Sequence, residues 1–164
     1  MGATSCDSVS CPLNNSVASV YNFYASARGD DGIFVEGEAV TLNDTLNISA
    51  IGPDTLLANR VVGASGVSLP VSFYADCDTL QFTFTDQEGR WGIDTLWVTK
   101  RNTHHFDDPS CPIHMWHTIL EVRSTHHLID TVIITNSAVN YDGDENCRIY
   151  FFTAKASDDD ATND

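Results

Sequence analysis

The sequence predicts an all-β protein: an antiparallel β-sandwich of about eight or nine short strands, with Greek-key-like connections and little or no helix. Apolar residues recur with a period of two, as in strands that bury one face. Residues that favour turns separate these runs roughly every 8–15 positions. No stretch of three helical turns carries an apolar stripe at the helical period. The unequal strand lengths favour a sandwich over a closed barrel.

The strand pattern is clearest where Leu80, Phe82 and Phe84 alternate with polar residues. A second alternating run begins at Trp116, and a β-branched and aromatic run begins at Cys147. In chain order, the expected strands are 17–26, 39–42, 45–50, 66–71, 80–85, 93–100, 116–123, 128–135 and 147–153.

The length of 164 residues is that of a single domain. We expect this domain to span residues 16–156. Residues 1–15 lack periodicity and predict a tether, and the acidic run 157–164 predicts a disordered tail.

The charge balance restricts the partners. Eight Lys and Arg oppose 23 Asp and Glu, which gives a formal net charge of −15. Such a chain repels phosphate groups, so we expect neither nucleic acid nor an anionic membrane surface as a partner. A protein or a glycan at the cell surface is the expected partner, and a lipid anchor is the expected membrane contact.

The cysteines indicate an exported protein. They are Cys6, Cys11, Cys77, Cys111 and Cys147. No two form a Cys-x-x-Cys pair, which disfavours zinc and thioredoxin-type motifs. The small residues 3–5 before Cys6 are typical of a lipoprotein cleavage site, and the other four cysteines then form an even set that can close two disulfides. The alternative is a short Cys6–Cys11 bridge, which leaves an odd thiol among the remaining three.

No catalytic pattern stands out. The chain has neither Gly-x-Ser-x-Gly nor His-Glu-x-x-His, so we expect no enzyme activity and no cofactor. All six histidines lie between residues 104 and 127. The alternative of a metal-binding protein would use His104, His105, Asp107, His114 and His117. Because neighbouring residues of a strand point to opposite faces, we expect these histidines not to ligate as adjacent pairs.

Two further patterns have competing interpretations. Trp91, Trp97 and Trp116 could form a platform on which sugars stack, as in a carbohydrate-binding module, although burial in a core is the commoner fate. An Asp-Ser/Thr-aliphatic tripeptide recurs, for example at 54–56 and 94–96. We interpret it as an aspartate that closes a turn before a strand, although it also resembles a bacterial O-glycosylation acceptor.

Four segments carry a resemblance to a known family. They are 108–112 (Asp-Pro-Ser-Cys-Pro), 116–122 (Trp-His-Thr-Ile-Leu-Glu-Val), 125–134 (Thr-His-His-Leu-Ile-Asp-Thr-Val-Ile-Ile) and 147–151 (Cys-Arg-Ile-Tyr-Phe). Together they resemble a family of uncharacterised exported lipoproteins of the Bacteroidetes type. The resemblance implies an all-β fold, export and lipid anchoring, and it assigns no site residues.

The sequence therefore favours a non-enzymatic lipoprotein of the cell envelope that acts as a binding or structural module. Its expected place is the periplasm or the outer-membrane surface. A metal-binding protein and a carbohydrate-binding module are the alternatives.

Overall fold

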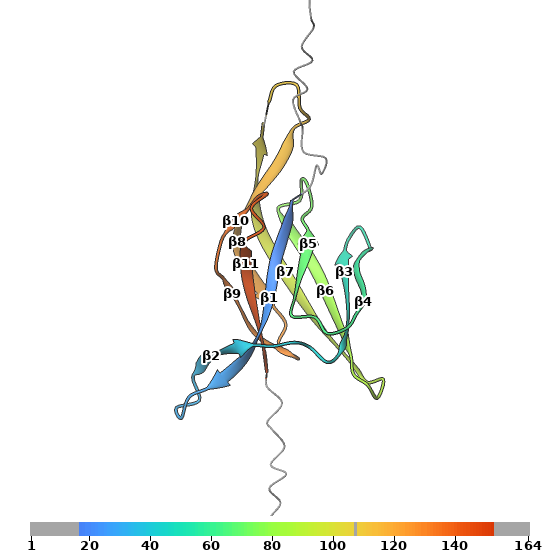
Figure 1. The fold of residues 1–164 in the computed structure, drawn as a ribbon, viewed down its shortest axis with the longest axis vertical. Coiled ribbons are helices and arrows are strands. Elements are labelled where there is room, and N and C mark those ends of the chain that lie inside the picture. The colour runs from blue at the N-terminus through green and yellow to red at the C-terminus, as the bar shows by residue number, and fades with distance from the viewer. Residues whose placement is uncertain (1–16, 107, 153–164) are drawn as a thin grey trace, which may run out of the picture.

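The computed structural model describes residues 17–106 and 108–152, which form eleven strands and no helix (Figure 1). The expected tether and acidic tail lie outside the described residues. The strands are β1 (Ala18–Arg28), β2 (Phe34–Ala39), β3 (Thr45–Ile51), β4 (Thr55–Val61), β5 (Gly66–Pro70), β6 (Cys77–Thr85), β7 (Trp91–His105), β8 (His114–Ser124), β9 (Ile129–Ile134), β10 (Ala138–Val139) and β11 (Glu145–Phe152). None of the described residues belongs to a helix that is long and apolar enough to cross a membrane.

The strands form two sheets, which confirms the all-β class. One sheet has the order β2-β1-β11-β9, with β5 also paired to β1, and the other has the order β10-β8-β7-β6-β3-β4. Strands β2, β4 and β10 were not expected. Most residues of β2 and β4 are exposed, and β10 has only two residues. The expected strand at 39–42 is wrong, since β2 ends at Ala39 and the chain then runs without strand structure to β3.

The pairing of β1 with β11 departs from the expected antiparallel arrangement. These two strands run parallel, with Phe23 opposite Ile149. Parallel neighbours need a long connection, and here all the other strands lie between them along the chain. Alternation shows which face of a strand is buried but not which strand lies beside it, so the sequence did not reveal this pair.

The core lies between the two sheets. Phe151 of β11 makes edge-to-face contacts with Phe23 of β1 and with Phe84 of β6, at ring centroid distances of 5.3 and 5.5 Å. Phe84 belongs to the six-stranded sheet and the other two to the five-stranded one. Burial of each such ring stabilises the fold by about 1.5–3 kcal/mol. The two sheets therefore share one apolar core.

A buried carboxylate holds the segment that crosses from one sheet to the other. Asp94 of β7 is 0% exposed. It accepts hydrogen bonds from the Thr125 hydroxyl at 2.6 Å and from the backbone N–H groups of His127, Leu128 and Ile129 at 2.7–3.0 Å. Burial by itself would raise the pKa of Asp94, but these donors outweigh it and leave the pKa below the ordinary value. Asp94 thus fixes the connection between β8 and β9.

The recurring tripeptide has more than one role. At Asp54-Thr55-Leu56 the aspartate lies in a turn and Thr55 begins β4, which confirms the turn interpretation there. At Asp94-Thr95-Leu96 that interpretation is wrong, because Asp94 lies inside β7. The same three residues therefore close a turn in one place and anchor a distant loop in another.

Candidate functional site

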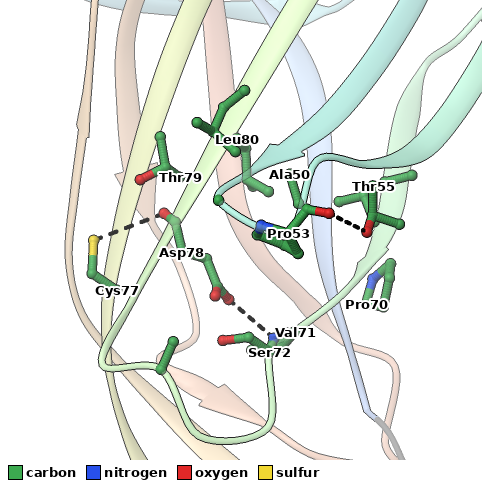
Figure 2. A pocket seen from close by; sticks show the side chains of 14 residues that line it. Ala50, Pro53, Thr55, Pro70, Val71, Ser72, Cys77, Asp78, Thr79 and Leu80 are labelled. Atoms are coloured by element: carbon green, nitrogen blue, oxygen red, sulfur yellow. Dashed lines mark hydrogen bonds between the residues drawn. The ribbon is translucent and has the colours of Figure 1, made fainter.

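An apolar cleft of about 440 Å³ opens where the β3–β4 turn meets the loop between β5 and β6 (Figure 2). One wall comes from the ends of β3 and β4, the second from the end of β5 and the loop that follows it, and the third from the start of β6. The cleft is lined by Ala50, Ile51, Gly52, Pro53, Thr55, Leu57, Pro70, Val71, Ser72, Ala75, Cys77, Asp78, Thr79 and Leu80.

The β3–β4 turn has a backbone that its sequence specifies. Gly52 has φ +107°, a conformation that side chains with a Cβ rarely adopt, and Asp54 has φ +51° in the left-handed region. The Thr55 hydroxyl donates a hydrogen bond to the Pro53 carbonyl at 3.4 Å (Figure 2). The turn therefore presents Pro53 to the cleft.

Two polar groups in the lining have remaining hydrogen-bonding capacity. Asp78 accepts a hydrogen bond from the backbone N–H of Ser72 at 3.2 Å (Figure 2). The hydroxyl of Ser72 is buried and has no hydrogen-bond partner among the described residues. A buried polar atom without a partner costs about 1–3 kcal/mol. Because this hydroxyl is buried, Asp78 is the polar group of the two that a ligand in the cleft can use.

A buried lysine holds the β5–β6 loop, which forms one wall of the cleft. Lys100 of β7 is 2% exposed. Its Nζ donates to the carbonyl oxygens of Ser72, at 3.0 Å, and of Ala75, and to Oδ1 of Asn102, at 2.7 Å. Its backbone N–H donates to the carbonyl of Asp76 at 2.8 Å. The cleft is thus preformed by contacts that β7 makes with the loop.

The charge of Lys100 is only partly compensated. Burial lowers its pKa, and the carboxylates of Asp78 and Asp76 raise it in part, so that the pKa lies below the ordinary lysine value. Lys100 was not among the site residues that the sequence predicted. A signal was present, because the alternation that places Leu96 and Val98 inward also places Lys100 inward.

His117 completes the buried network as a neutral group. Its Nδ1 lies 2.7 Å from Oδ1 of Asn102, which already accepts a hydrogen bond from Lys100. Because this oxygen can only accept, Nδ1 of His117 carries the proton and donates it. Burial, and then the positive charge of Lys100, lower the pKa of His117 to about 4.

This network predicts a loss of stability in acid. The folded chain resists protonation of His117 down to pH about 4, whereas the unfolded chain takes up that proton near 6.5. The free energy of unfolding should therefore fall as the pH drops through this window. His117→Asn places an amide N–H near the position of Nδ1 and does not titrate. Between pH 7 and pH 4 the free energy of unfolding of the variant, measured by urea denaturation, should fall by up to about 3 kcal/mol less than that of the unchanged protein.

The control for His117→Asn is His104→Asn, because His104 is exposed. That variant should keep the acid sensitivity of the unchanged protein. Equal pH dependence in His117→Asn and the unchanged protein would contradict the assignment of a buried neutral histidine.

The structure does not bring the proposed metal ligands together. His104 opposes Met115 on one face of the β7–β8 hairpin, and His105 opposes His114 on the other. His105 stacks on Trp116 with ring centroids 3.6 Å apart. His117 lies in the buried network described above, and Asp107 lies outside the described residues. Within residues 17–106 and 108–152, no three His, Cys, Asp or Glu side chains are grouped to hold a metal ion.

The sequence predicts two disulfides among Cys11, Cys77, Cys111 and Cys147, but Cys77 and Cys147 take part in none. Cys77 and Cys147 carry free thiols, whereas Cys111 is disulfide-bonded. Cys77 is exposed on the outward face of β6, and Cys147 is buried in the core from β11. Their sulfur atoms therefore lie on different sides of the six-stranded sheet. Cys6 and Cys11 lie outside the described residues.

Comparison with known proteins gives a family and no function. No curated protein and no solved structure matches the chain. One family model matches residues 45–151, from β3 to β11, and so includes the whole cleft lining and the whole buried network. On this match, which spans well over half of the chain, the protein belongs to DUF6452, a family of unknown function.

Proposed function

We propose that this chain is an exported, non-enzymatic binding module built as a β-sandwich, whose cleft seats a small apolar group that carries a hydrogen-bond donor. The preformed cleft is the observation that carries this proposal. Its volume of about 440 Å³ lies within the range of roughly 300–1,000 Å³ that is typical of small-molecule sites. Its lining is mainly aliphatic, with few polar groups, as in such sites.

The polar groups of the lining select the ligand. Asp78 offers carboxylate oxygens to the cleft and already accepts one hydrogen bond, from the backbone N–H of Ser72. Asp54 and Asp76 are exposed beside lining residues, so the rim is negatively charged as well. A ligand with an ammonium group next to an apolar tail satisfies these features, and a carboxylate would be repelled.

Among the described residues, the cleft lining has one carboxylate, Asp78, and no histidine that could act with it as an acid or a base. A binding role is therefore favoured over catalysis. The disulfide at Cys111 supports export, since disulfides persist in oxidising compartments. The expected lipid anchor at Cys6, and with it a place at the periplasmic or outer-membrane surface, stays a prediction.

Titration of the isotope-labelled protein with hexylamine, followed by amide chemical shifts, tests the proposal. We expect saturable shifts in segments 50–57 and 70–80, and at least tenfold weaker binding of hexanoate. Asp78→Asn should remove most of this preference, because it removes the carboxylate that pairs with the ammonium group.

A filled cleft provides the control for this titration. Ala75→Phe puts a large side chain at the cleft and should abolish the shifts, whereas Ala27→Phe, on an exposed position of β1, should not. Absence of saturable shifts with hexylamine in the unchanged protein would refute the proposed ligand class.

A further inference from the structure

The outward face of the six-stranded sheet carries no charge at its centre. On β3, β6 and β7 the outward residues alternate with buried core residues. We define the neutral face as Thr45, Asn47, Ser49, Gln81, Thr83, Thr85, Trp91, Ile93, Thr95 and Trp97. The preference of threonine for strands explains part of this composition. It does not explain why none of these positions holds a charged residue in a chain with 23 acidic side chains.

The register places these residues side by side in rows across three strands. Thr85 lies opposite Thr45 on one side and Trp91 on the other. In the next row, Thr83 lies opposite Asn47 and Ile93. Since neighbouring strands lie about 4.7–4.9 Å apart, the rows form a continuous surface of hydroxyl and amide groups.

Two indole rings lie on this surface along β7. Trp91 is 69% exposed. Trp97 follows six residues later on the same face, about 20 Å away at the rise of a β-strand, and the guanidinium of Arg123 lies 5.8 Å from its ring centroid. The two indoles therefore give the otherwise polar face two apolar ring surfaces, one near each end of the row of outward residues on β7.

The surface fits an uncharged glycan. Hydroxyl and amide groups both donate and accept hydrogen bonds, as sugar hydroxyls do. The apolar ring faces of sugars suit the indoles, whose bodies are apolar and whose N–H groups are polar. The ten residues include no cation, and Arg123 beside Trp97 is a single positive charge in a chain with a net charge of −15. Nucleic acids and acidic polysaccharides are therefore disfavoured.

We propose that the neutral face binds an uncharged polysaccharide along β7, with sugar rings stacked on Trp91 and Trp97 and hydroxyl groups bonded to the side chains of β3 and β6. This site shares no lining residue with the cleft. Trp97 lies opposite Thr79, which lines the cleft, but Trp91 lies opposite Thr85, which does not. The Trp91 variant therefore tests this proposal separately from the function proposed above.

Affinity electrophoresis of the full chain in gels containing laminarin, mannan or xylan, with alginate as the charged polymer, tests the proposal. At least one of the three neutral polymers should retard the protein, and alginate should not. Trp91→Ala should weaken the retardation at least tenfold. Because Trp91 is 69% exposed, this variant should fold normally, which circular dichroism checks.

Tyr74→Ala is the matched control, since Tyr74 is 77% exposed but lies in the β5–β6 loop. It should leave the retardation unchanged, whereas Thr83→Lys, which puts a charge at the centre of the face, should abolish it. No retardation by any neutral polymer, retardation by alginate, or an equal loss in Tyr74→Ala and Trp91→Ala would each overturn the proposal.

Discussion

Replacement of Asp94 by asparagine is expected to lower the free energy of unfolding by about 3 kcal/mol or more. The carboxylate accepts one hydroxyl and three backbone hydrogen bonds while fully buried. An asparagine amide has one acceptor oxygen, and its NH₂ group would face N–H donors that lose their partner. Two buried donors without acceptors account for the expected magnitude, which urea denaturation measures.

The chain offers a matched control for this substitution. Asp54 heads the same Asp-Thr-Leu tripeptide but lies exposed in a turn, with φ +51°. Asparagine tolerates this left-handed conformation, so Asp54→Asn should change the stability by no more than about 0.5 kcal/mol. If both variants lost the same stability, Asp94 would not be the anchor of the β8–β9 connection.

Replacement of Lys100 by methionine is expected to cost about 3 kcal/mol or more and to loosen a wall of the cleft. The change leaves the Ser72 carbonyl without the Lys100 donor, and it removes one of two donors from the Ala75 carbonyl and from the Asn102 oxygen. Asp78 is left without a nearby cation. It also removes a positive charge that lowers the pKa of His117. We therefore expect lower stability, a higher His117 pKa by NMR and faster amide exchange in the β5–β6 loop.

Arg101→Met is the control for Lys100→Met. Arg101 follows Lys100 on β7 but is exposed on the opposite face, so its loss should cost less than about 0.5 kcal/mol. A His117 pKa that stays the same in Lys100→Met would contradict the buried network, even if the stability fell. Native domains are stable by only about 5–15 kcal/mol, so either buried substitution should remove a large part of the total.

Local sequence determined the class of fold and the faces of its strands. Leu80, Phe82 and Phe84 alternate with polar residues and are buried. Such a period of two can be recognised from neighbouring residues alone, because successive residues of a strand point to opposite faces. The same rule places Lys100 inward and separates His104 from His105. The alternation rule therefore argues against a metal site built from adjacent histidines. It also predicts a buried lysine at position 100, which was not among the expected site residues.

Tertiary structure alone decided which distant residues meet. Residues far apart in the chain meet in the parallel pair of β1 and β11. They also meet where Asp94 accepts hydrogen bonds from the 125–129 segment and where Lys100 donates hydrogen bonds to the β5–β6 loop. The cleft likewise combines the β3–β4 turn with the start of β6. A strand's side-chain pattern shows which face is buried but not which strand is its neighbour. Strand order is set by how two sheets close over one core, and this is why the sequence showed the strands of the fold and only the structure showed the site.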